Sequence, residues 1–73
     1  MIFDQVLKNV GARIRLIREN KGLSQQDLAA LCNFEKSNMA RIEAGRTNLT
    51  LKTLFKISQA LEITISELLN NEG

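Results

Sequence analysis

The sequence predicts an all-α fold, in which a single domain spanning residues 1–73 forms a compact bundle of five short helices. Three observations favour this fold. Apolar residues recur at spacings of three and four, as on the buried face of a helix. Residues that favour helix N-caps precede several of these stretches. The composition, 44% hydrophobic with three Phe and no Pro, Trp or Tyr, suits a core packed from Leu, Ile and Val.

The first helix is expected to run from about Asp4 or Gln5 to Asn20, and Gly22 follows it as a terminator. Residues at three- and four-residue spacing share one face of a helix. The expected buried stripe consists of Leu7, Val10, Ile14 and Ile17.

Residues 23–45 predict two short helices separated by a tight turn. Ser24 is the expected N-cap of the first of these helices, and Asp27 completes a capping box. Asn33 provides the positive φ that the turn needs, since Asn tolerates this conformation better than most residues. The expected inward face consists of Leu28, Ala29 and Leu31.

The next helix, about residues 35–44, is expected to place Met39 and Ile42 inward with Ala40 beside them, and Gly45 ends it. Its outward face then carries the polar residues Lys36, Ser37, Asn38 and Arg41. A helix pair of this kind can present hydrogen-bonding side chains to the major groove of DNA.

The last two helices are predicted from the residues that can cap their N-termini. Thr50 is the expected N-cap of a helix that ends at Leu61. Thr64 and Glu67 form a second capping box for a final helix that buries Leu68, and Ile63 closes the core just before it. The apolar face of the fourth helix is expected to comprise Leu51, Leu54, Ile57 and Leu61.

The net charge of +2 is unevenly distributed along the chain. Residues 57–73 carry acidic residues without a basic one, whereas residues 36–56 carry five basic residues, Lys36, Arg41, Arg46, Lys52 and Lys56, against the single acid Glu43. A basic cluster around the third helix is what a phosphate-binding surface requires.

Catalysis has little support in this composition. The chain has no His, the commonest general base and metal ligand. The single Cys32 has no His partner and is interpreted as a buried structural thiol. No enzyme activity, cofactor, metal site or small-molecule site is therefore expected. No signal peptide or membrane-spanning segment is apparent either.

The segment LSQQDLA…NFEKSNMARIEAG resembles the helix-turn-helix of the phage-repressor (Cro/CI-like, XRE-type) family of transcriptional regulators. The resemblance extends through GRTNLTLKTLFKISQALEITISELL and back to VGARIRLIRENKG, about residues 10–69. Within that family the chain is most similar to restriction–modification controller proteins. The resemblance implies a DNA-binding transcriptional regulator in the prokaryotic cytoplasm or encoded by a phage.

The resemblance also implies which residues bind double-stranded DNA. Base contacts are expected from Lys36, Ser37, Asn38 and Arg41. Phosphate contacts are expected from Ser24, Gln25, Arg46, Thr47 and Asn48. Glu35 departs from the family, which usually has Ser or Thr at this N-cap. A carboxylate there repels phosphate unless it accepts from cytosine N4. The alternative is an ion pair with Lys36 or another neighbouring basic residue.

Two further features are implied by the family. Arg18 and Glu43 are expected to pair and to brace the first helix against the recognition helix. A homodimer that reads a pseudo-palindromic operator is expected to form through Leu49, Phe55, Ile65 and Leu69, although these residues also suit an ordinary core. Two alternatives remain open: a protein-interaction module such as an antitoxin, and the N-terminal fragment of a longer repressor.

Overall fold

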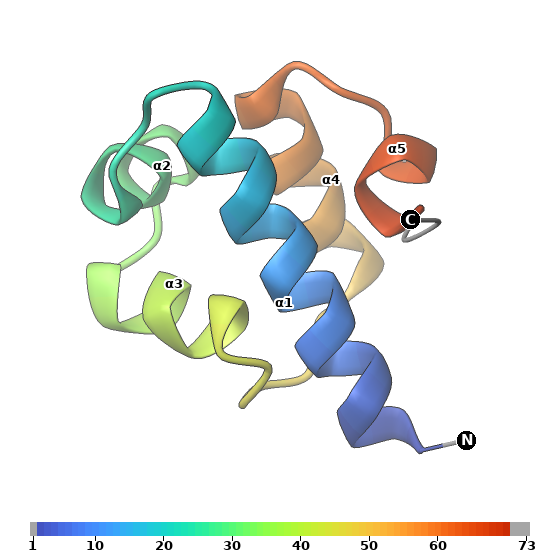
Figure 1. Cartoon of the computed structure of the whole chain (residues 1–73). Coiled ribbons are helices and arrows are strands. Elements are labelled where there is room, and N and C mark those ends of the chain that lie inside the picture. The colour runs from blue at the N-terminus through green and yellow to red at the C-terminus, as the bar shows by residue number, and fades with distance from the viewer. Residues whose placement is uncertain (1, 71–73) are drawn as a thin grey trace.

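The computed structural model describes residues 2–70, which form five α-helices and contain no strand (Figure 1). Glu72, one of the acidic residues in the segment 57–73, lies outside the described residues. The all-α prediction is confirmed. The helices are α1 (Phe3–Asn20), α2 (Gln25–Cys32), α3 (Lys36–Glu43), α4 (Leu51–Leu61) and α5 (Ile65–Leu69).

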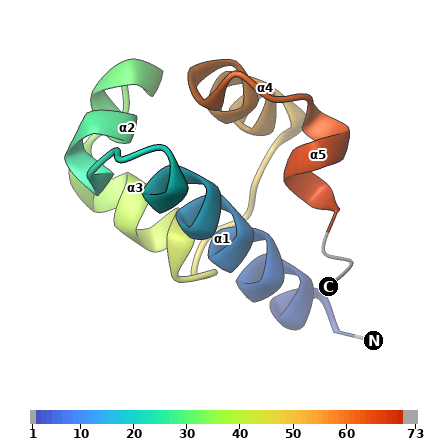
Figure 2. The ribbon, with the colours of Figure 1, turned by 45° about the horizontal axis from the view of Figure 1, so that its top comes forward.

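Helix α1 lies at the centre of the arrangement. The pair α2–α3 packs on one side of it and α5 on the other, while α4 contacts both α2 and α5 (Figures 1 and 2). Because α1 contacts α2, α3 and α5, it is the element against which the helix-turn-helix is oriented.

Every helix contributes at least one side chain to a single core. Its largest members are at most 2% exposed, and they are Ile14, Leu28, Met39, Ile42, Ile57, Leu61 and Leu68. Val10, Ile17 and Ile63 pack against this cluster while remaining partly exposed. The short helices depend on this shared burial, since isolated helices of such length are marginal in water.

The predicted capping boxes are both present. The Ser24 hydroxyl accepts from the Asp27 N–H, and the Asp27 carboxylate accepts from the Ser24 N–H. Thr64 and Glu67 repeat the arrangement at α5. In each box the backbone N–H lowers the pKa of the accepting carboxyl below its ordinary value. Asn33 has a φ of 60°, as its place in the turn predicted.

Two predictions about the core are wrong. Leu31 is 60% exposed and Leu51 is 69% exposed, although both were expected to face inward. At about 100° per residue, the buried side of α2 is defined by Leu28, Ala29 and Cys32, and Leu31 falls outside it. Leu51 lies at the start of α4, and the buried residues of that helix are all in its later turns.

Cys32 is buried, as expected for a structural thiol. Its Sγ donates to the Lys56 carbonyl oxygen at 3.8 Å, and burial raises the pKa of the thiol. The raised pKa keeps Cys32 protonated and therefore a poor nucleophile near neutral pH.

Candidate nucleic-acid interface

The outward face of α3 carries polar side chains without partners in the protein. Lys36, Ser37 and Arg41 are exposed and Asn38 is half-buried. Among the described residues, none of these four side chains makes a hydrogen bond or ion pair with another part of the protein. Their donors and acceptors are therefore available to an external ligand.

The opposite face of α3 fixes the helix to the rest of the domain. Met39 and Ile42 are buried in the core. The turn before α3 is held as well, since the Phe34 N–H donates to the Ala29 carbonyl at 2.8 Å. The Lys56 ammonium lies 5.7 Å from the centre of the Phe34 ring, which joins this turn to α4. The polar face is thus presented from a helix with a defined position.

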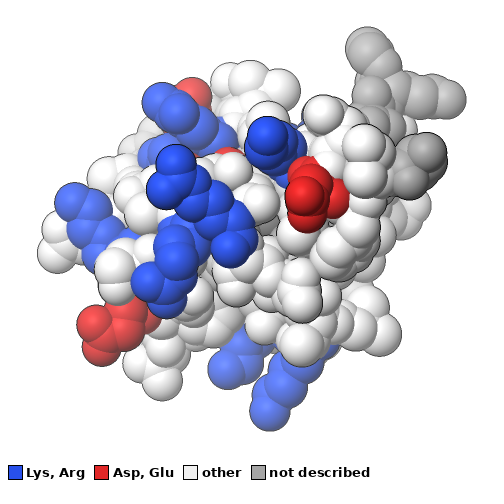
Figure 3. Space-filling model, turned by 90° about the horizontal axis from the view of Figure 1, so that it is seen from below, with Lys and Arg blue, Asp and Glu red and all other residues white. Residues whose placement is uncertain are grey.

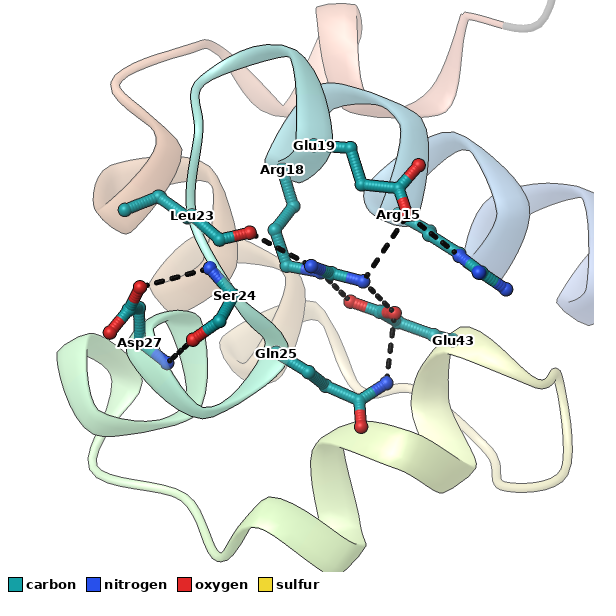
Figure 4. Close-up of polar contacts among 8 residues, drawn as sticks. All are labelled: Arg15, Arg18, Glu19, Leu23, Ser24, Gln25, Asp27 and Glu43. Atoms are coloured by element: carbon teal, nitrogen blue, oxygen red, sulfur yellow. Dashed lines mark hydrogen bonds and ion pairs between the residues drawn. The ribbon is translucent and has the colours of Figure 1, made fainter.

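A buried ion pair joins α3 to α1. Arg18 Nε donates to Glu43 Oε2 at 2.7 Å, and Arg18 Nη2 donates to Glu43 Oε1 at 3.0 Å (Figure 4). The two side chains are only 8% and 3% exposed. The hydrogen bond to Glu43 raises the pKa of Arg18 above its ordinary value. This bidentate geometry fixes the relative orientation of the two helices.

The same carboxylate also receives a hydrogen bond from α2. Gln25 Nε2 donates to Glu43 Oε1 at 3.0 Å, and Arg18 Nη1 donates to the Leu23 carbonyl at 2.8 Å (Figure 4). Arg18 and Glu43 therefore connect α1, the start of α2 and the end of α3. The link through Gln25 was not anticipated from the sequence, because it joins residues that only the helix packing brings together.

The residues expected to bind phosphate lie at the start of α2 and after α3. Gln25 has one amide N–H left after its bond to Glu43, and the Ser24 hydroxyl can still donate while it accepts from Asp27. Arg46 and Asn48 are exposed and Thr47 is half-buried. Figure 3 shows Lys and Arg side chains gathered on the face that carries α3, which is the lower face in Figure 1.

Lys8 lies near the end of α3, although it was not among the DNA contacts expected from the sequence. Its side chain is exposed, and its backbone lies directly against Gly45 at the end of α3. Glu35, the residue that departs from the family pattern, is exposed at the N-cap of α3 and makes no side-chain capping bond there. An uncompensated carboxylate therefore stands at one end of the polar face.

The residues expected at a dimer interface lie on α4, on α5 and just before α4. Phe55 is 49% exposed and Leu69 is 44% exposed, whereas Ile65 is half-buried. Leu49 packs partly against the core. A groove of about 220 Å³ between α1 and α5 includes Leu69 in its lining.

Two other kinds of site find no support in the part of the chain that the structure describes. No three His, Cys, Asp or Glu side chains gather there in a way that could hold a metal ion. No helix within residues 2–70 is both long and apolar enough to cross a bilayer.

The fold and the polar face of α3 together define a helix-turn-helix domain of the DNA-binding class. Residues 14–68 match the sequence pattern of the helix-turn-helix family. The chain belongs to this family, whose matching relatives are transcriptional regulators and repressors.

Solved structures support the same assignment. The restriction-modification controller protein C.AhdI from Aeromonas hydrophila is 39% identical, with a TM-score of 0.83 over 85% of this chain and 94% of that one. The biofilm regulator SinR, solved in complex with DNA, is 34% identical, with a TM-score of 0.76 over 84% of this chain and 98% of that one.

A phage protein is also similar in sequence. The immunity repressor protein of Bacillus phage phi105 is 40% identical over 63 residues, which are 86% of this chain. The chain spans only 44% of that repressor's length.

Proposed function

We propose that this chain regulates transcription by binding a pseudo-palindromic operator as a homodimer, with α3 of each subunit in the major groove. The observation that carries the proposal is the polar face of α3: its side chains have no partners in the described part of the protein, while the opposite face is buried. The relative SinR, whose structure was solved with DNA, supports it. A regulator of this kind acts in the prokaryotic cytoplasm, where its operator lies.

Within this proposal the residues of α3 read the bases. Arg41 presents a planar guanidinium that can donate two parallel hydrogen bonds to guanine O6 and N7, and Lys36 can donate to the same atoms. Asn38 can pair with adenine N6 and N7, while Ser37 can contact several bases. These side chains confer sequence preference because each base pair presents a distinct pattern of donors and acceptors in the major groove.

The second set of residues sets the register on the duplex by contacting phosphates. It comprises the start of α2 and the segment after α3, with Lys8 as an additional cation: Ser24, Gln25, Arg46, Thr47, Asn48 and Lys8. Gln25 is well suited to this role because Glu43 holds its amide in one orientation. Backbone N–H groups at the start of α2 add to this site.

The homodimer is proposed to form through Leu49, Phe55, Ile65 and Leu69. Phe55 and Leu69 are large apolar side chains that remain about half exposed in the monomer. Pairing these surfaces about a twofold axis would place two α3 helices in successive major grooves, about 34 Å apart along the duplex.

The salt dependence of DNA binding tests the proposal. Phosphate contacts release counterions, so the logarithm of the association constant should fall linearly with the logarithm of salt concentration, by about 0.9 per contact. We expect a slope that corresponds to several contacts per subunit, measured by fluorescence anisotropy on labelled duplexes. Arg46→Gln should reduce the slope by about one contact. The matched change Arg13→Gln should not, because the Arg13 guanidinium donates to the Glu67 carbonyl on the α5 side of α1. Affinity that stays flat from low to physiological salt would contradict the proposal.

A further inference from the structure

The end of α3 lies unusually close to the backbone of α1, and two glycines make this approach possible. A Cβ atom built on Gly11 would lie 2.5 Å from the carbonyl oxygens of both Ile42 and Glu43. A Cβ atom on Gly45 would lie 2.7 Å from the Cα of Lys8 and 2.8 Å from its backbone nitrogen. At Gly11 the two helices therefore meet backbone to backbone, without a side chain between them. At Gly45 the contact also includes the Lys8 side chain, whose Cγ lies 2.8 Å from the Cβ position.

Gly11 lies at a position in α1 where glycine is not favoured by the helix itself. It is buried in the interior of an 18-residue helix, where Gly is one of the least favourable residues. Unlike Gly45, it is not among the residues with positive φ, so a turn does not explain it. What requires Gly at this position is the space taken by the last carbonyl groups of α3.

We propose that Gly11 and Gly45 are positioning residues for DNA recognition, because they set the depth at which the C-terminal end of α3 rests on α1. This inference rests on the proposed function, since it concerns the placement of the same base-reading helix. Arg41 directly precedes the two residues whose carbonyls contact Gly11, so the depth of this contact sets the position of its guanidinium relative to a base edge.

Base contacts and phosphate contacts differ in how large a displacement of α3 they tolerate. A Cβ atom on Gly11 would force the last turn of α3 outward by on the order of 1 Å to restore ordinary van der Waals separation. Hydrogen bonds to base edges operate over a range of about 2.7–3.2 Å, so a shift of this size breaks them. Phosphate contacts tolerate it, because a phosphate oxygen accepts hydrogen bonds from a wider range of directions than the paired acceptors of a base edge. The Arg18–Glu43 pair cannot restore the position, because its side chains adjust to the backbone and do not determine its separation.

The experiment compares Gly11→Ala and Gly45→Ala with two matched controls. Ala12→Gly makes the reverse change at the next position of α1, which is exposed. Gly22→Ala introduces the same methyl group at a φ of +74°, against +72° for Gly45, but with nothing within 4 Å. The probes are a duplex that the wild-type chain selects from a random library and a scrambled duplex of the same composition. The readout is the ratio of the two dissociation constants, with folding checked by circular dichroism.

We expect each positioning variant to reduce the preference for the selected duplex by about tenfold or more while changing affinity for the scrambled duplex by less than about twofold. The controls should keep the wild-type ratio. An unchanged ratio in folded Gly11→Ala would overturn the inference, as would loss of the ratio in the controls. If Gly11→Ala does not fold, the ratio measured for Gly45→Ala tests the inference. If neither variant folds, the contact is purely structural and the inference is overturned.

Duplex selection by the wild-type chain distinguishes failure of this inference from failure of the proposed function on which it rests. Selection of no duplex by the wild type would overturn the proposed function and this inference together. If the wild type selects a duplex and the variants keep the same preference for it, only the positioning role is overturned.

Discussion

Glu43 shows how one buried residue can organise several elements. Its carboxylate accepts hydrogen bonds from Arg18 and from Gln25, and the ion pair is almost completely removed from solvent. Burying two charges is costly, and their attraction offsets that cost only with good geometry and further hydrogen bonds. Here the bidentate contact and the additional bonds provide both, so loss of either partner leaves a charge desolvated without compensation.

Removing one partner should therefore destabilise the domain strongly. Glu43→Gln and Arg18→Met are each expected to lower the free energy of unfolding by about 3–5 kcal/mol, measured by urea denaturation. The double variant should lose less than the sum of the two. The matched pair Arg15 and Glu19, whose side chains are 64% and 50% exposed, should contribute less than about 1 kcal/mol in the same cycle. Strict additivity for Arg18 and Glu43 would mean that the two residues do not interact energetically.

Arg41 and Arg46 should affect DNA binding differently, although both are exposed arginines. Arg41→Ala is expected to cost about 1–3 kcal/mol at the preferred duplex and to relax preference at one base position per half-site. Arg46→Ala should weaken binding to all sequences about equally, because a phosphate contact carries no base information. Binding selections from a random library with each variant would measure this. Uniform weakening by both would remove Arg41 from the base-reading set.

At the scale of the helices, stability depends on how the ends are capped. Asp27 and Glu67 each accept the N–H of their own N-cap residue, which lowers the pKa of both carboxyl groups. A lowered pKa means that the folded state binds protons less readily than the unfolded state. The associated stability is present above the ordinary carboxyl pKa of about 4 and is lost as pH falls through the lower folded pKa.

Replacement of Asp27 should therefore change the pH dependence of stability. Asp27→Asn is expected to be less stable than wild type at pH 7, and the two proteins should converge as pH is lowered toward about 2. Glu67→Gln should behave in the same direction at α5. Thermal unfolding followed by circular dichroism at a series of pH values measures the difference. Parallel curves for wild type and variant would show that the Asp27 carboxylate contributes nothing to the cap.

At the scale of the whole molecule, the proposed function requires that two copies of the chain form a homodimer. Phe55→Glu is expected to weaken the homodimer, because it places a charge in the proposed apolar interface. DNA affinity should fall by about tenfold or more with it, since the second half-site is no longer bound by a linked subunit. Leu31→Glu is the control: Leu31 is also an exposed apolar residue, at 60%, but it lies on α2, outside the proposed interface. Sedimentation equilibrium showing equal dimerisation for both variants would contradict this interface.

The sequence by itself determined the helices, their caps and most of the core. The capping boxes at Ser24 and Thr64, the positive φ of Asn33 and the inward position of Met39 depend on interactions within three or four residues. These features can be predicted from the short segment that contains them, without knowing which other parts of the chain pack against it. Arg18 and Glu43 were matched through the family resemblance, because their separation of 25 residues carries no local signal.

The tertiary structure decided which faces are covered and which groups meet. Leu31 lies off the buried side of α2 and Leu51 lies in the first turn of α4. No other element of the described chain covers them, so both remain exposed. Gln25 meets Glu43, and Gly11 meets the end of α3, only because α1, α2 and α3 pack at particular depths and angles. Spacing along a chain defines the direction in which a side chain points. What it meets there depends on segments far away in the sequence, which is why the placement of α3 had to come from the fold.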